Sequence, residues 1–256
     1  MKIAITGKGG TGKTTFSAML GYLFSKEGKS VFFVDADPDG NLGLTLGFSQ
    51  EELRKIQPIS EMKELIAERT ESTGAGYFKL NPRVDDIPEK FSLKKDNFRF
   101  LVLGTLKKGG AGCYCPENAF LKALLRNLLV QREEIVILDM PAGIEHLSRG
   151  TAESVDLLLI MVEPTIKSIQ TTDKILKLAE DIRIKSVKII VNKVIDKKDT
   201  DFVRENLKSS SEIIGSISFN NELHLAEKLN QPVYFTAKKT LKEVEKIKEQ
   251  FLIESF

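Results

Sequence analysis

The chain has 256 residues and a formal net charge of +2, and 29% of its residues are charged. This length suits one large α/β domain with a substantial core. The balanced charge provides no strongly basic surface, so we expect neither nucleic-acid binding nor stable membrane association. The first strand-like segment begins at Lys2, which leaves no room for a secretory signal, and a cytoplasmic location is expected.

Short apolar runs typical of strands alternate with helix-length amphipathic segments along the chain. The runs lie at 2–6, 31–35, 98–103, 135–139, 157–162, 187–192 and 213–217. This alternation predicts an α/β fold, in which a mostly parallel central sheet carries helices on both faces, as a single domain over residues 1–256. Residues 50–96 do not follow the pattern, and we interpret them as an insertion.

A glycine-rich segment at residues 7–14, with the sequence Gly-Lys-Gly-Gly-Thr-Gly-Lys-Thr, follows the first predicted strand and precedes a segment of helical spacing at 16–24. This context is typical of a phosphate-binding loop (P-loop) rather than of an incidental glycine-rich turn. Glycines let backbone N–H groups face phosphate oxygens, and the helix start adds positive potential. We expect nucleotide contacts from Gly7, Lys8, Gly9, Gly10, Thr11, Gly12, Lys13, Thr14 and Thr15.

Within this loop two side chains have predicted chemical roles. Lys13 is expected to reach the β and γ phosphates as a catalytic residue, and the hydroxyl of Thr14 is expected to bind a magnesium ion. Acidic residues follow two other predicted strands, at the same sheet edge. Asp139 suits an outer magnesium-supporting role, and Asp37 suits the orientation of the attacking water. The alternative for both carboxylates is a capping role in the next turn, and Asp35 is interpreted as a support for the loop.

Several motifs together resemble the MinD/ParA/nitrogenase-iron-protein class of P-loop ATPases, almost end to end. They are Lys8 beside Lys13, the segments 35–41 and 139–143, and the later segments 191–193, 215–220 and 226–233. The resemblance implies a nucleotide-dependent homodimer in which Lys8 crosses the interface to the partner's phosphates. It also implies that Asp37 positions water and that Asn192 contacts adenine. The alternative for Lys8 is a solvated loop lysine.

The choice of base depends on the residues after Asn192. Guanine recognition in P-loop GTPases normally uses Asn-Lys-x-Asp, but the fourth position here is Ile195. Asp196 arrives one residue late, and a bulge would be needed to bring it into place. The sequence therefore favours ATP over GTP.

The only two cysteines of the chain, Cys113 and Cys115, are separated by one residue in a glycine-rich loop. Pro116 suits the first position of a helix over about 117–131, which places Cys115 at or next to the N-cap, where a thiolate is favoured. A two-fold dimer would bring two such pairs together, and four thiolates suit zinc or nickel at the dimer interface. The alternative is two small thiols that fill space. His146 and His224 are interpreted as structural or surface residues.

A P-loop ATPase of this class with a mid-chain Cys-x-Cys resembles the CooC family of accessory ATPases. The resemblance implies nickel insertion into carbon monoxide dehydrogenase as the function and that enzyme as the client. Three alternatives stay open: maturation of another nickel or iron–sulfur enzyme such as acetyl-CoA synthase, an ATP-dependent reductase with a bridging iron–sulfur cluster, and a MinD/ParA-like positioning ATPase. The last would need a basic patch or a membrane-binding tail, whereas the segment 238–256 balances its lysines with glutamates and favours a helix packed on the sheet.

Overall fold

The computed structural model describes residues 1–37, 40–72, 77–104, 115–144, 147, 149–208, 211–229 and 231–253. Its centre is an eight-stranded sheet in the order β3-β4-β2-β5-β1-β6-β7-β8. The strands are β1 (Lys2–Gly7), β2 (Val31–Asp35), β3 (Leu93–Lys95), β4 (Phe98–Val102), β5 (Ile135–Asp139), β6 (Leu157–Val162), β7 (Val187–Val194) and β8 (Glu212–Ser218). Only the pairing of β3 with β4 is antiparallel among these pairs.

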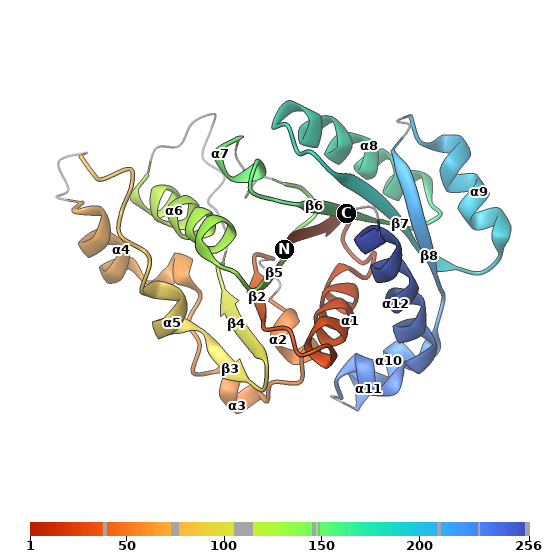
Figure 1. The fold of residues 1–256 in the computed structure, drawn as a ribbon, viewed down its shortest axis with the longest axis horizontal. Coiled ribbons are helices and arrows are strands. Elements are labelled where there is room, and N and C mark those ends of the chain that lie inside the picture. The colour runs from red at the N-terminus through yellow and green to blue at the C-terminus, as the bar shows by residue number, and fades with distance from the viewer. Residues whose placement is uncertain are drawn as a thin grey trace.

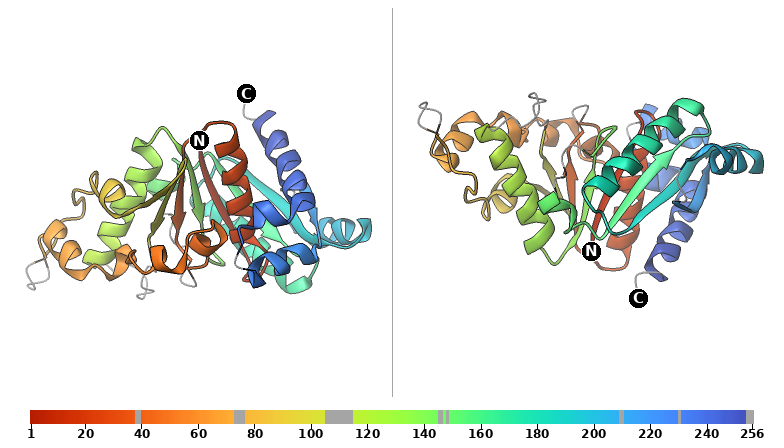
Figure 2. Two further views of the ribbon diagram at one scale, coloured as in Figure 1. Left: turned by 90° about the horizontal axis from the view of Figure 1, so that it is seen from below. Right: turned by 90° about the horizontal axis from the view of Figure 1, so that it is seen from above.

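Helices surround this sheet (Figures 1 and 2). They are α1 (Lys13–Lys26), α2 (Leu42–Thr45), α3 (Gln50–Leu53), a 3₁₀ turn η1 (Ile59–Glu61), α4 (Lys63–Thr70), α5 (Ile87–Phe91), α6 (Pro116–Gln131), α7 (Arg149–Ala152), α8 (Ile166–Asp181), α9 (Lys197–Asn206), α10 (Asn221–Lys228), α11 (Val233–Thr236) and α12 (Lys238–Ile253). None of the helices in the described ranges is long and apolar enough to cross a membrane.

Successive residues of the central strands contribute to two separate apolar layers. Ile3 and Ile5 of β1 pack in one layer with the buried residues of α1, α2, α11 and α12, whereas Ala4 packs in the other with α4, α6, α8 and α9. This division follows from the period of two along a strand, because both faces of a parallel sheet are covered. The predicted mostly parallel sheet with helices on both faces is confirmed.

Helix α1 lies unusually close to the sheet at Gly21. A Cβ atom at this position would lie 2.0 Å from Cζ of Phe33 on β2, well inside van der Waals contact. Glycine thus lets the phenyl ring of Phe33 occupy the space that a side chain on α1 would fill. Because α1 begins at Lys13, this packing also fixes where the preceding loop lies.

The seven predicted strands are all present, and their ends differ from the prediction by at most two residues. Strand β3 was not predicted, since its sequence Leu-Lys-Lys is short and largely polar, as suits a strand at the edge of a sheet. The predicted packing of the C-terminal segment is also confirmed. Its apolar residues Leu241, Val244, Ile247 and Phe251 are buried.

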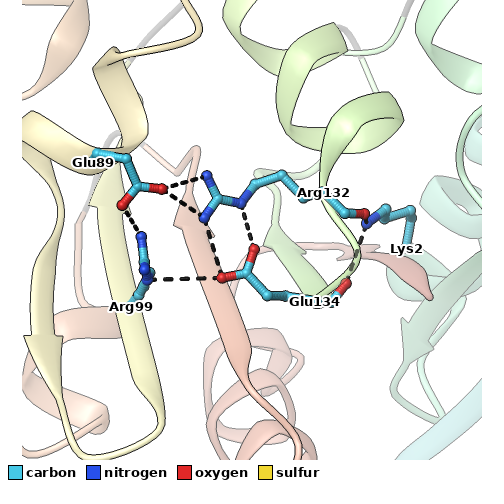
Figure 3. Close-up of polar contacts among 5 residues, drawn as sticks. All are labelled: Lys2, Glu89, Arg99, Arg132 and Glu134. Atoms are coloured by element: carbon cyan, nitrogen blue, oxygen red, sulfur yellow. Dashed lines mark hydrogen bonds and ion pairs between the residues drawn. The ribbon is translucent and has the colours of Figure 1, made fainter.

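At the amino ends of β1 and β5, a network of charged side chains joins these strands to β4 and to α5 (Figure 3). The guanidinium of Arg132 donates to Glu89 Oε1 at 2.9 Å from both Nη atoms and also binds both carboxylate oxygens of Glu134. Arg99 pairs with both carboxylates, and the ammonium of Lys2 donates to the carbonyls of residues 132 and 134. The hydrogen bonds from Arg132 lower the pKa of the Glu134 carboxyl. This network satisfies its own charges with protein groups.

Candidate nucleotide site

The loop between β1 and α1 lies at the carboxyl edge of the sheet, beside a cavity of about 480 Å³. Its lining includes Gly9, Gly10, Gly12, Lys13, Thr14 and Thr15 from the loop, together with Asp37 after β2. Ligands of open parallel sheets bind at this edge, so the fold brings the predicted phosphate contacts to one concave surface.

Two glycines are required by the shape of the loop. Gly7 has φ 145°, and a Cβ there would lie 2.2 Å from the carbonyl oxygen of Met161 on β6. Gly12, the N-cap of α1, has φ 87°, and a Cβ there would lie 2.3 Å from Nδ2 of Asn192. Both conformations lie in the left-handed region that favours glycine. The neighbouring strands therefore leave room only for backbone at these positions.

The start of the loop is a tight turn around Lys8. The carbonyl of Lys8 accepts hydrogen bonds from the backbone N–H of Thr11 at 3.2 Å and from its hydroxyl at 2.8 Å. Lys8 itself is half-buried. Its predicted role at a partner's phosphates involves a second chain and stays a prediction.

The structure brings the two other predicted catalytic residues together. Lys13 is buried at the first position of α1, and its Nζ lies 3.8 Å from Oδ2 of Asp37. Asp37 is itself largely buried, and its carboxylate lies at the cavity wall. A cation at the phosphates and a carboxylate for the attacking water thus share one wall of the cavity.

Asp139 ends β5 as a fully buried carboxylate, held by two hydroxyl groups of α1. Thr14 Oγ1 donates to Oδ2 at 2.7 Å, and Ser17 Oγ lies 3.1 Å from Oδ1. Burial raises the pKa of the Asp139 carboxyl to about 6, against the hydrogen bonds and the charge of Lys13. Ser17 was not predicted, although its spacing of three residues from Thr14 places both hydroxyls on one helix face.

Asp35 lies beside Asp139, since the two residues are paired in register on β2 and β5. Its carboxylate accepts the backbone N–H groups of Asp37 at 3.1 Å and Leu42 at 3.2 Å. Burial, followed by the charge of Asp139, raises the pKa of Asp35 to about 7. The predicted supporting role for Asp35 agrees with these contacts, because it fixes both ends of the segment that carries Asp37.

The carboxylate and hydroxyl oxygens at this point fit a magnesium ion. Oxygen ligands of Asp and Thr are the type that this cation prefers, and two buried carboxylates with raised pKa values mark a position where positive charge is favourable. The hydroxyl of Thr6 fixes the segment after Asp139, since it lies 2.9 Å from the carbonyls of both Pro141 and Gly143.

A second cavity of about 270 Å³ adjoins the first and shares Gly10, Gly12 and Thr15 with it. Asn192 of β7 lines it, and its Nδ2 donates to the carbonyl of Thr11 at 2.7 Å. Asp196 instead caps α9, where Oδ1 accepts from the N–H of Lys198 at 2.7 Å. Asp196 is therefore engaged at the start of α9 and is not among the residues that line the second cavity.

Of the predicted metal ligands, Cys113 lies outside the described residues. His146, which was interpreted as a structural or surface residue, also lies outside them. Cys115 is the N-cap of α6, and Pro116 is its first residue, as predicted. Cys115 borders a cavity of about 240 Å³ with Lys122 and Arg126 of α6. Within the described ranges no three His, Cys, Asp or Glu side chains gather into a metal-binding group. His224 is exposed, in agreement with a surface role.

A family model of the CobQ/CobB/MinD/ParA nucleotide binding domain matches residues 2–233, most of the chain. The chain belongs to this family. A nucleotide-binding domain agrees with the P-loop described above, and the predicted α/β P-loop fold is confirmed.

Relatives place the chain more finely within the CobQ/CobB/MinD/ParA family. The carbon monoxide dehydrogenase accessory protein CooC of Rhodospirillum rubrum is 45% identical over 237 residues, which cover 91% of this chain and 89% of that protein. An ATP-binding protein of Methanocaldococcus jannaschii is 44% identical over 96% of both chains. The prediction of a CooC-type ATPase is confirmed, and the chain is a P-loop ATPase.

Solved structures of other proteins have similar folds. The MinC:MinD cell division protein complex of Aquifex aeolicus includes a chain with a TM-score of 0.70 and 23% identity, and the match covers 99% of this chain and 96% of that one. A plasmid partition protein of Borrelia burgdorferi bound to AMPPNP has a TM-score of 0.71 at 17% identity, with 98% of each chain covered. At these identities the likeness concerns the fold.

Proposed function

We propose that this protein is an ATP-dependent, homodimeric maturation factor that helps to insert nickel into carbon monoxide dehydrogenase in the cytoplasm. The observation that carries this proposal is the 45% identity to CooC across 91% of the chain. The position of Cys115 at a helix start gives it chemical support, because the positive end of α6 favours the thiolate form that binds soft metal ions.

In this proposal the phosphates of ATP bind the loop amides, with Lys13 at the β and γ positions. The hydroxyl of Thr14 would bind a magnesium ion, and Asp139 would support it through its hydrogen bond with Thr14; the ion would neutralise phosphate charge. Asp37, beside Lys13, orients the attacking water. The adenine base lies in the second cavity near Asn192, because that cavity continues directly from the loop residues Gly10 and Gly12.

The homodimer completes each site through Lys8 of the partner subunit, where added positive charge stabilises the transition state. Each subunit also contributes the thiolates of Cys113 and Cys115, so four sulfur ligands hold nickel or zinc between the subunits as cargo. ATP and metal favour the same closed dimer, and by linkage each ligand then strengthens the binding of the other. Hydrolysis opens the dimer and releases the metal to the client enzyme.

The test measures subunit association and zinc or nickel affinity, with and without a non-hydrolysable ATP analogue. For the wild type, we expect the analogue to raise metal affinity by about tenfold. The double variant Cys113→Ala/Cys115→Ala should bind nucleotide normally and lose the metal. The matched variant Cys113→Ser/Cys115→Ser keeps the size of both side chains and should also lose soft-metal binding. Unchanged metal affinity in both double variants would contradict the cysteine assignment.

The client is tested separately with nickel-free carbon monoxide dehydrogenase. We expect ATP and the nickel-loaded protein to activate this enzyme, and the cysteine double variants to fail. Activation of nickel-free acetyl-CoA synthase in its place would instead assign the protein to that related maturation pathway. The positioning-ATPase alternative has less support, because the apolar face of α12 is buried against the sheet rather than presented to a membrane.

A further inference from the structure

Lys193 is held in a strained backbone conformation inside β7. Its φ is 61°, in the left-handed region, whereas the other described non-glycine residues with positive φ, namely Glu71, Asp96 and Arg183, lie at helix ends or in the β3–β4 turn. The pairing with β8 shifts at the same place, because Val191 faces Ser216 while Val194 faces Ser218. One extra residue on β7 therefore forms a bulge, a feature that re-aims side chains beside functional sites.

The bulge directs two consecutive residues at the carbonyl groups of the P-loop. The ammonium of Lys193 donates to the carbonyl of Gly10 at 2.8 Å, and the amide of Asn192 donates to the carbonyl of Thr11 at 2.7 Å. Asn192 is itself fixed, because its Oδ1 accepts the backbone N–H of Lys193 at 2.8 Å. Two successive peptide groups of the loop are thus held from β7.

A carboxylate from the neighbouring strand completes the arrangement. Glu163, directly after β6, lies with Oε1 2.5 Å from the ammonium of Lys193, and its side chain is only 16% exposed. Its own backbone N–H donates to the hydroxyl of the buried Ser168 at 3.0 Å, which anchors it to α8. Glu163 therefore holds the ammonium of Lys193 in place beside the carbonyl of Gly10.

We infer that Lys193 and Glu163 act as positioning residues for the nucleotide, because they clamp the P-loop in its phosphate-binding conformation. In a trans peptide the C=O and the next N–H point in opposite directions. Holding the carbonyl of Thr11 on β7 therefore fixes the direction of the Gly12 N–H group. Holding the carbonyl of Gly10 fixes the Thr11 N–H group, which closes the turn of the loop on the carbonyl of Lys8. Preorganised N–H groups bind an anion more tightly, because the loop loses less freedom on binding.

An ordinary surface ion pair would explain the contact between Lys193 and Glu163. It would not explain the strained backbone at Lys193 or the hydrogen bond from its ammonium to the P-loop. Such pairs contribute little, and Lys193 is 44% exposed. The strained backbone and the bond to Gly10, however, serve no purpose in a surface pair. The two explanations differ in their effect on nucleotide binding, which the following variants measure.

The experiment compares Lys193→Met with Lys188→Met, which removes the same charge from the same strand. Lys188 pairs with Glu212 near the start of β7, at the opposite edge of the sheet. We expect Lys193→Met to raise the Kd for a fluorescent ADP analogue and the KM for ATP by about tenfold, the size typical of a lost charged hydrogen bond, with kcat within about threefold. Lys188→Met should leave nucleotide affinity unchanged.

Further variants separate positioning from folding. Lys193→Arg keeps a donor and a charge and should restore affinity to within about threefold of the wild type. Glu163→Gln keeps the shape of the side chain and should weaken ADP binding by about threefold, with no further loss when it is added to Lys193→Met, since the pair acts as a unit. This variant also serves if Lys193→Met does not fold.

The inference is overturned if Lys193→Met and Glu163→Gln bind ADP within twofold of the wild type. It is overturned equally if Lys188→Met weakens binding as much as Lys193→Met. A wild-type protein that fails to bind nucleotide would instead contradict the ATPase function itself, which separates the two failures.

Discussion

At the carboxyl edge of the sheet, burial raises the pKa values of Asp35 and Asp139 to about 7 and about 6. At the amino edge of the same sheet, hydrogen bonds from Arg132 lower the pKa of Glu134. The two carboxylates at the carboxyl edge are fully buried, and no arginine pairs with them in the described part of the chain. Glu134 at the amino edge is only partly buried, and it is paired with arginines that compensate for its lost hydration. Among the residues that the structure describes, the carboxylates at the carboxyl edge are thus left desolvated and without an arginine partner, at the expected nucleotide site. The carboxylates at the amino edge, which only connect structural elements, are paired with arginines.

This contrast predicts opposite consequences for substitution at the two edges. At the carboxyl edge, loss of a carboxylate should cost activity and spare stability. At the amino edge, loss of an arginine should cost stability and spare activity, because the partly buried charge of Glu134 is left without its counter-ion.

The largest effect is expected for Asp139→Asn. The ATPase rate should fall by about a hundredfold or more, because the carboxylate that supports the magnesium site is lost. The midpoint of thermal unfolding without magnesium at pH 8 should stay equal or rise, since a desolvated charge is removed. Steady-state hydrolysis and a thermal melt measure both, and a large fall in thermal stability would break the comparison at this edge.

The next effect is expected for Arg132→Met, which keeps much of the side-chain length over the ring of Phe32. The free energy of unfolding should fall by about 2–3 kcal/mol, because Glu89 and Glu134 lose their shared partner. Urea unfolding measures this change. The ATPase rate at 20 °C should stay near that of the wild type, and a selective loss of activity would contradict the purely structural role of this edge.

The third prediction concerns pH. The pKa of Asp35 is raised in the folded protein, so between about pH 4 and about pH 7 the folded state binds more protons than the unfolded state. Deprotonation of Asp35 therefore lowers the stability of the folded protein as the pH rises through this range. The pKa of Glu134 is lowered in the folded protein. The stability that this carboxylate contributes is fully present above its pKa in the unfolded chain, and it is lost as the pH falls through its pKa in the folded protein. The stability of Asp35→Asn relative to the wild type should therefore increase with pH, whereas that of Glu134→Gln should decrease.

Unfolding free energies between about pH 2 and 8, measured in the absence of magnesium, check both slopes, because the slope for Glu134→Gln lies below the ordinary glutamate pKa of 4.5 and the slope for Asp35→Asn lies between about pH 4 and 7. Slopes of the same sign for the two variants would show that the edges do not differ in the way proposed.

The smallest effect is expected for Glu89→Gln. This carboxylate is 47% exposed, and solvent screens its pairs with Arg99 and Arg132, so the loss should be about 0.5 kcal/mol. Urea unfolding next to Arg132→Met gives the ratio of the two losses. A loss as large as that of Arg132→Met would place the energetic centre of the network at Glu89 instead.

Much of this architecture follows from the sequence because its signals are local. The strand at 135–139 and the start of α6 at Pro116 are set by apolar runs and by proline, which need no distant partner to be recognised. Strand β3 has no such signal, since three residues pair at the edge only because β4 is already in place.

The site shows the same division. The P-loop, Asp37 and Asp139 were predicted from motifs, and their proximity follows from the shared edge of a parallel sheet. The clamp of Lys193 and Glu163 joins the ends of two strands to a loop more than 150 residues earlier in the chain. Local sequence patterns do not report contacts between residues so far apart in the chain. The bulge that makes it is likewise visible only once β8 is paired.

The missing side chain at Gly21 has a further consequence for how the protein tolerates mutation. A methyl group at this position would clash with the ring of Phe33 and displace α1 from the sheet. Lys13 and Thr14 would move with the helix, because they form its first turn. Gly21 lies about two helical turns after Thr14. We therefore expect a conservative replacement at this position to lower activity, although the position does not line the nucleotide cavity. Loss-of-function alleles in this chain should therefore arise beneath the first helix as readily as within its nucleotide contacts.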